Sequence, residues 1–311
     1  MTEKEFFEAV KDGVLEQLQK DDPSITGSVQ QVKKVNDVTY NGLSLRSPNT
    51  RVMPILYLDD YYRQFAEGDI TVSQAVSHAV QVCRKHIMNG ANMKVEWLSD
   101  YNDAKDRLVP AICNTAACTE YLSNRPSEQF HDLSIYYKIL VDIDDNTDGS
   151  VAVTNELLSS WGITYDELKE QAWRNIHNIN GPLITPMAEI IKEMLPEQEG
   201  EEFYEKAQDD YPLFVLTSQN HIGGAVYMAD MDVLKGISDD LGIDDYVILP
   251  CSREEVIIMP VDPVKASDHY TDYKDMVVEI NHDGHTISPD IFLGDSVYLF
   301  SKSSGCVEIA A

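Results

Sequence analysis

The sequence is poor in basic residues: 24 Lys and Arg stand against 53 Asp and Glu, a net charge of −29 over 311 residues. This charge disfavours binding to nucleic acid or to an anionic membrane. A folded chain of this mass exposes about 13,000 Å², or roughly one net negative charge per 450 Å², several-fold sparser than on duplex DNA. Only a local cluster of acids would therefore imitate a phosphate backbone for a basic partner. The simpler interpretation is that the charge maintains solubility.

Long apolar runs and cysteines are also scarce. No stretch approaches the ~18 apolar residues that a membrane span needs. The first ten residues are acidic and amphipathic, unlike a signal peptide. The five cysteines are odd in number and widely spaced, which favours reduced, mostly buried thiols over a disulfide framework. We therefore expect a cytoplasmic protein.

Catalytic fingerprints are missing as well. The sequence contains no HExxH, GxSxG, phosphate-loop or dinucleotide-binding pattern. It therefore names no reaction, and we expect no catalytic residues and no cofactor.

Capping boxes mark the start of three expected helices. In each box a threonine and a Glu or Gln three residues later exchange hydrogen bonds. The pairs are Thr2 with Glu5, Thr71 with Gln74, and Thr164 with Glu167. Alternating apolar residues over 29–46 predict strands, with turns at Asn36-Asp37 and Asn41-Gly42. A short strand is expected over 108–113, a helix over 115–122, and either a strand or a helix over 133–141.

The C-terminal third has the clearest pattern. Strands are expected over 213–216, 225–228, 246–249 and 256–259, and a helix that Asp230 or Asp232 caps precedes the third of them. A second helix is expected over 270–280. This β-β-α-β-β-α order predicts an antiparallel sheet with helices on one face, and the whole chain is predicted to be an α+β protein. We expect an N-terminal α+β domain over 1–195, an acidic linker or patch over 196–211, and a C-terminal domain over 212–311.

Several landmarks occur in an order that resembles a known family. They are Gly42-Leu43, Pro54, Tyr57-Leu58, Tyr62, Gly68, Asn114, Leu122, Pro126, Asp132-Leu133, Trp161-Gly162, Asp166-Glu167-Leu168, Leu216-Thr217, Gly224-Ala225, Leu249-Pro250, Ser252 and Glu255. Together they resemble an uncharacterised family of proteins from Gram-positive gut bacteria, often found on mobile elements. The resemblance spans nearly the whole chain, implies no activity, and would fit an accessory or counter-defence role. The chain departs from the family's Ser-Ser-x-His-Glu motif, because Cys251 replaces the first serine and Glu254 the histidine.

One segment has the spacing of a metal loop. Asp144, Asn146 and Asp148 alternate before Gly149, as the oxygen ligands of a calcium loop do. The twelfth position, where such loops carry a glutamate, is Asn155. A polar hairpin turn explains the same composition, and we favour it over calcium binding.

Histidine and cysteine patterns are weaker. His282 and His285 have a spacing that two metal ligands can share, but they flank an Asp-Gly turn and are interpreted as a loop. Cys251 lies beside Glu254 and Glu255, which would raise its pKa, so it is interpreted as a packed thiol. The alternative is an enzyme of unrecognised type, whose site would lie near the 220–224 and 250–255 loops.

The remaining candidate is an acidic segment over 197–210, with seven acids and one lysine. The acids are Glu197, Glu199, Glu201, Glu202, Glu205, Asp209 and Asp210. Phe203, Tyr204 and Tyr211 would add apolar anchors. A solvated linker explains the same composition. Our hypothesis is a non-enzymatic acidic protein that binds a basic protein partner, such as a nucleic-acid-handling factor, through these acids.

Overall fold

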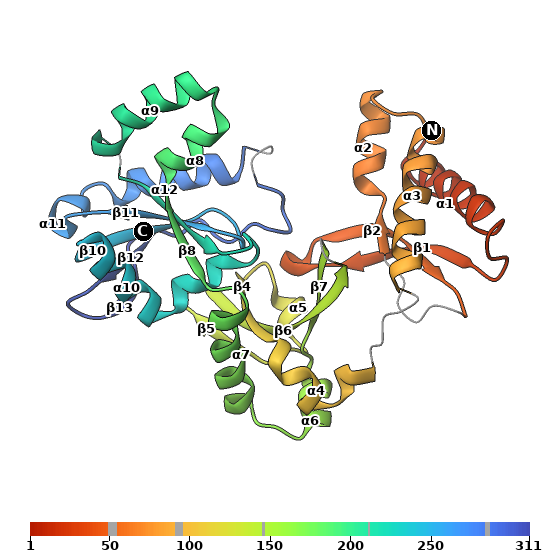
Figure 1. The fold of residues 1–311 in the computed structure, drawn as a ribbon, viewed down its shortest axis with the longest axis horizontal. Helices are drawn as coiled ribbons and strands as arrows, with labels where there is room; N and C mark the ends of the chain where they lie inside the picture. The colour runs from red at the N-terminus through yellow and green to blue at the C-terminus, as the bar shows by residue number, and fades with distance from the viewer. Residues whose placement is uncertain (49–54, 91–95, 145–146, 211, 284–286) are drawn as a thin grey trace. The chain divides into compact units, whose positions relative to one another are not determined.

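The computed structural model describes residues 1–48, 55–90, 96–144, 147–210, 212–283 and 287–311. Helices and antiparallel sheets make up these ranges (Figure 1), which confirms the predicted α+β class. The chain forms two compact units. The first consists of Met1–Lys34, Val38–Ala104 and Leu140–Val151, and the second of Val35–Asp37, Lys105–Ile139 and Ala152–Ala311. Within the described ranges, no helix is both long and apolar enough to cross a bilayer.

The first unit packs helices against a three-stranded antiparallel sheet of order β1-β2-β3. Its helices are α1 (Glu3–Leu18), α2 (Asp59–Glu67), α3 (Val72–Gly90) and α4 (Tyr101–Ala104), and its strands are β1 (Thr26–Lys33), β2 (Thr39–Arg46) and β3 (Ile55–Tyr57). The apolar stripe of α1 is buried against α3, because Phe6, Val10 and Val14 share one face. The predicted capping boxes at Thr2 and Thr71 both form.

One predicted turn is wrong in this unit. Asn41 and Gly42 lie inside β2, where Gly42 is opposite Gln30 of β1 and Tyr57 of β3. Gly42 is required by close packing, because a Cβ there would lie 2.3 Å from Cγ2 of Ile55. The other predicted turn, at Asn36-Asp37, is correct, because the short 3-10 helix η1 (Val35–Asp37) connects β1 to β2.

The second unit begins with a sheet in which β6 is central. Its strands are β4 (Leu108–Asn114), β5 (Ser127–Phe130) and β6 (Leu133–Asp144), in the order β4-β6-β5, and β7 (Thr147–Ala152) also pairs with β6. Residues 140–144 of β6 and 147–151 of β7 belong to the first unit. Residues 133–141, for which the sequence pattern allowed a strand or a helix, are therefore part of a strand. Helix α5 (Thr119–Leu122) is shorter than predicted, because Asp37 accepts the backbone N–H groups of Glu120 and Tyr121 and fixes a late start.

The second sheet of this unit has six antiparallel strands in the order β13-β12-β10-β11-β9-β8. They are β8 (Pro182–Pro186), β9 (Phe214–Ser218), β10 (Asp245–Pro250), β11 (Val256–Pro260), β12 (Tyr298–Ser301) and β13 (Cys306–Ile309). The last residue of β8, Pro186, is directly opposite the first residue of β9, Phe214. The terminal hairpin and the predicted β10–β11 pair are both present.

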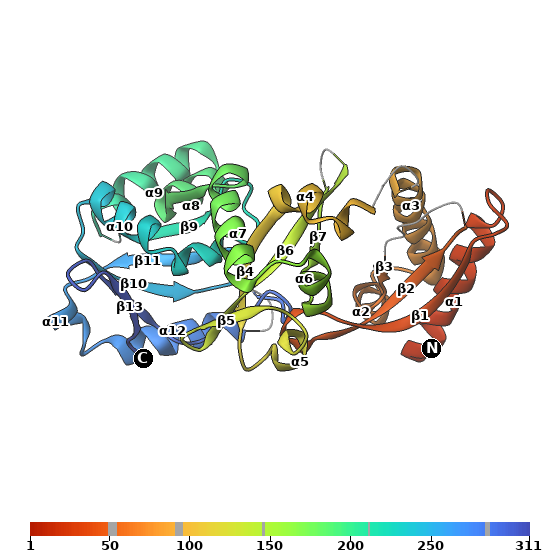
Figure 2. The ribbon, with the colours of Figure 1, turned by 90° about the horizontal axis from the view of Figure 1, so that it is seen from below.

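Helices cover both faces of this sheet, and not one face as predicted. Helix α10 (Met231–Leu241) lies on one face, where the Tyr246 hydroxyl donates to the Leu234 carbonyl. Helix α12 (Tyr270–Asn281) lies on the other, where Val277 packs against Val247. Figure 2 shows the two helices on opposite sides of β10 and β11. Adjacent residues of β10 therefore face different helices, and residues 246–250 of the strand are all buried.

The remaining helices of the second unit are η3 (Lys105–Arg107), α6 (Asn155–Trp161), α7 (Tyr165–Ile179), α8 (Met187–Met194), α9 (Glu197–Asp210), η4 (Gly224–Ala229) and α11 (Pro263–Ala266). Helix α7 begins at the predicted capping box of Thr164 and Glu167. The predicted strand over 225–228 is instead the 3-10 helix η4. Strand β9 already pairs with β8 and β11, so a strand following it finds no free edge there.

The expected domain boundary does not coincide with the division into units. Residues 197–210 form α9 within the second unit, and not an unstructured linker. Strand β8 precedes the expected boundary, yet it pairs with β9, which follows it. Backbone hydrogen bonds thus join residues that the predicted domains 1–195 and 212–311 would separate.

Candidate functional site

The acidic segment is one arm of a closely packed helical pair (Figure 1), in which α9 follows α8. The two helices approach closely at Gly200, where a Cβ would lie 2.5 Å from the Lys192 carbonyl oxygen. The Lys192 ammonium lies 2.8 Å from the Glu201 carboxylate and 4.8 Å from the centre of the Tyr204 ring. Hydrogen bonding to Glu201 raises the pKa of Lys192. We refer to residues 187–210 as the acidic hairpin.

The acidic hairpin combines exposed acids with exposed apolar side chains. It carries nine acids and two lysines. Of the predicted partner-binding residues, Glu197, Glu199, Glu201 and Glu202 are exposed on α9. The side chains of Glu205, Asp209 and Asp210 lie outside the described residues.

The apolar part of this surface differs from the prediction. Phe203 and Tyr204 are half-buried, and Tyr211 lies outside the described residues. Met194 and Leu195, at the junction of the two helices, are instead 80% and 36% exposed. Among the described side chains of the acidic hairpin, these two are the exposed large apolar groups.

The two loops of the enzyme alternative do meet. The backbone N–H of Gly224 donates to the Glu254 carbonyl at 3.0 Å, and the Thr217 hydroxyl donates to the same oxygen at 2.8 Å. The Gly223 N–H donates to the Glu254 side chain. The two loops therefore lie together at one end of the six-stranded sheet.

The chemistry at this junction does not resemble a nucleophilic site. Burial, with a smaller effect of Glu255, raises the pKa of Cys251 to about 12, so the thiol is protonated at neutral pH. His221 lies on an exposed turn with a φ of 59°. Among the described residues, the polar contact of the Cys251 Sγ is the Leu249 carbonyl oxygen, at 4.0 Å, and no histidine contacts this sulfur. The structure does not bring Cys251 and His221 together.

Strand β6 adds two polar side chains that the sequence analysis missed. Tyr136 and Lys138 are two residues apart and therefore lie on the same face of β6. The Tyr136 hydroxyl lies 3.5 Å from Nη1 of Arg253. Burial lowers the pKa of Lys138, and the Glu254 carboxylate opposes this effect. Arg253 also donates from Nε to the Asp290 carbonyl at 3.0 Å. The loop side chains are thus largely engaged in holding the loop, as a structural turn requires.

The candidate metal residues are placed as follows. Asn146 lies outside the described residues, as do the side chains of Asp144 and Asp148, so the calcium hypothesis stays a prediction. Nε2 of His282 lies 2.9 Å from Oδ2 of Asp295, whereas His285 lies outside the described residues. Across the ranges that the structure describes, no three His, Cys, Asp or Glu side chains are grouped as metal ligands.

A histidine–aspartate pair joins α7 to α10. Nε2 of His177 lies 2.8 Å from Oδ2 of Asp230, whose Oδ1 accepts the N–H groups of Asp232 and Val233 at the start of α10. The sequence predicted the cap but not the histidine, which lies 53 residues earlier in the chain. No local spacing indicates that pair.

The comparisons with known proteins confirm one part of the resemblance, membership of an uncharacterised family. A model described as a family of unknown function, DUF5688, matches residues 3–302. No curated protein and no solved structure matches the chain. The chain belongs to the DUF5688 family of unknown function.

Proposed function

We propose that this protein binds a basic protein partner through its acidic hairpin. The observation that carries the proposal is the folding of residues 197–210 into a helix, on which Glu197, Glu199 and Glu202 are each exposed. A helix of fixed geometry loses less conformational entropy on binding than an unstructured acidic tail would.

The partner's chemistry follows from the exposed groups. Lysine or arginine side chains would pair with the acids and speed the encounter electrostatically. Met194 and Leu195 offer an apolar contact next to the charged face. A nucleic-acid-handling protein has a suitable basic surface. A cytoplasmic location and an accessory or counter-defence role on a mobile element fit this proposal and stay predictions.

The test begins with capture of partners from an extract of the native host, at about 50 mM and about 300 mM salt. The partner's affinity is then measured with a triple variant that leaves the Lys192–Glu201 ion pair intact. The variant is Glu197→Gln, Glu199→Gln and Glu202→Gln. At about 0.5 kcal/mol for each exposed ion pair, the loss of three weakens binding by about tenfold.

A matched control removes the same charge elsewhere. Glu16, Glu67 and Glu279 are exposed and lie outside the acidic hairpin. Changing these three to glutamine should alter the affinity by less than twofold. Equal weakening by both triple variants would attribute binding to net charge. A complex indifferent to salt, or a partner with an acidic surface, would contradict the proposal.

A further inference from the structure

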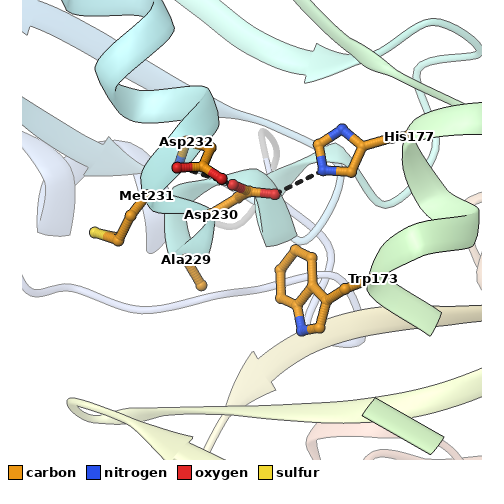
Figure 3. A pocket seen from close by; sticks show the side chains of 6 residues that line it. All are labelled: Trp173, His177, Ala229, Asp230, Met231 and Asp232. Carbon is orange, nitrogen blue, oxygen red and sulfur yellow. Dashed lines mark hydrogen bonds and ion pairs between the residues drawn. The ribbon is translucent and has the colours of Figure 1, made fainter. Parts of the chain in front are cut away.

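A pocket of about 330 Å³ lies where α7 faces the start of α10 (Figure 3). Trp173 and His177 come from one face of α7, because they are four residues apart. Ala229, Asp230, Met231 and Asp232 line the other side. The volume is at the lower end of the range for small-molecule sites. All of these residues belong to the second unit.

The charges of the pocket favour a cation. The described residues that line it include the carboxylates of Asp230 and Asp232, and none of these residues is a lysine or an arginine. The side chain of Asp230 is only 12% exposed, so little water surrounds its charge. An anion is disfavoured for a second reason, because Oδ1 of Asp230 already accepts the N–H groups of Asp232 and Val233 at the start of α10.

The aromatic and apolar groups define the kind of cation. Indole is the strongest cation–π partner among the side chains, and Trp173 lines the same pocket as the Asp230 carboxylate (Figure 3). Met231 and Ala229 give the pocket an apolar wall. His177 and the two carboxylates are not arranged as metal ligands, since no ligand group of three occurs in the described part of the chain. An organic ammonium group needs only the carboxylates and the ring.

We infer that this pocket binds a small organic cation, namely a protonated amine with a compact apolar or aromatic body. The ammonium group lies between the carboxylates of Asp230 and Asp232, and the body lies against Trp173. The inference is independent of the acidic hairpin, so either proposal can fail without the other.

The test uses three probes of similar shape: benzylamine, benzyl alcohol and benzoate. Each is titrated into the full chain while the indole N–H signals of the three tryptophans are followed by NMR. A Trp173→Phe variant assigns the signal of Trp173. Benzylamine is expected to shift that signal saturably at millimolar concentration. Benzyl alcohol and benzoate are expected to shift the Trp173 signal by less than a tenth as much as benzylamine does.

Two variants locate the binding groups. Asp232 is exposed, so Asp232→Asn should fold normally and weaken benzylamine binding by about threefold to tenfold, since one of two carboxylates is lost. Trp173→Leu, followed by calorimetry, should weaken it by about fivefold. The control is Asp240→Asn, which removes the same charge at the far end of α10 and should change the affinity by less than twofold.

Three results would overturn the inference. The first is the absence of saturable benzylamine binding up to about 20 mM. A dissociation constant above that concentration is too weak for a specific small-molecule site. The second is equal binding of the alcohol or of benzoate. The third is an unchanged affinity in both Asp232→Asn and Trp173→Leu, with circular dichroism showing that both variants are folded.

Discussion

Asn175 on α7 donates from its side-chain Nδ2 to the carbonyl of Leu108 at 2.9 Å, where strand β4 begins. The same nitrogen donates to the Lys105 carbonyl at 2.6 Å, and Oδ1 accepts from Gln171 at 2.7 Å. The side chain is buried, with 7% of its residue surface exposed. One amide thus satisfies two backbone carbonyls at the junction between η3 and β4.

Replacing Asn175 should therefore destabilise the second unit. In Asn175→Ala both carbonyls lose a donor, which costs about 2–3 kcal/mol of unfolding free energy. Urea denaturation measures the loss. Asn178→Ala is the control, because Asn178 is exposed and its side chain bonds to its own helix. A similar small loss in both variants would show that the buried amide is not needed.

Two helical glycines should respond in opposite directions to alanine. Alanine normally stabilises a helix interior by about 0.5–1 kcal/mol relative to glycine. Gly236→Ala on α10 should follow this rule, because nothing lies within 4 Å of the added Cβ. Gly200→Ala should instead lower the unfolding free energy, because its Cβ would lie 2.5 Å from a backbone oxygen of α8.

Thermal denaturation of the two glycine variants gives the signs directly. Stabilisation by Gly200→Ala would mean that α8 and α9 do not pack as described. The proposal of a supported acidic surface would lose its basis in that case.

Asp230 should have separable roles as a helix cap and as a charge. Asp230→Ala removes the cap of α10 and should cost about 1 kcal/mol or more. Asp230→Asn keeps an equally good cap and should cost less than half as much, although it removes the charge beside His177. Chemical denaturation at neutral pH compares the two variants. An equal loss in both would place the stabilisation in the interaction with His177.

Cys251 should resist thiol reagents in the folded protein. With its pKa raised to about 12, roughly one thiol in 10⁴ is ionised at pH 8. Labelling with iodoacetamide, followed by mass spectrometry, should modify Cys251 only after denaturation. Rapid labelling of Cys251 in the native protein would revive the enzyme alternative at the loop junction.

The same thiol should make stability depend on alkaline pH. Its folded pKa lies above that of an exposed thiol, so the unfolded chain loses this proton first as the pH rises. The stabilisation is complete below about pH 8.5 and is lost progressively towards pH 12. Between pH 8 and 10.5 the wild-type protein should lose up to about 2 kcal/mol more than Cys251→Ala. Parallel profiles by urea denaturation would contradict this.

Features determined by local sequence were predictable. The capping boxes at Thr2, Thr71 and Thr164 involve residues three apart, and all three form. The strand pair over 246–249 and 256–259 is separated by a short loop and was also correct. Such signals need no knowledge of the rest of the chain.

Features determined by distant contacts were not predictable. Residues 197–210 have the composition of a solvated linker, but packing of Gly200 on Lys192 makes them a helix. The 3-10 helix η4 replaces a strand because both neighbours of β9 come from elsewhere in the sequence. The pairing of His177 with Asp230 similarly depends on how α7 and α10 meet.

The pairing of Pro186 with Phe214 has a consequence for how this family can vary. The ladder continues past this pair, since the Met187 N–H donates to the Leu213 carbonyl at 2.8 Å. Residues 187–213 therefore form a long connection between two antiparallel neighbours, β8 and β9. A tight turn could join the same two strand ends. Relatives could shorten, lengthen or replace this excursion while the six-stranded sheet stayed intact. The acidic hairpin can therefore change in sequence and length between relatives, as their binding partners differ, without loss of the sheet.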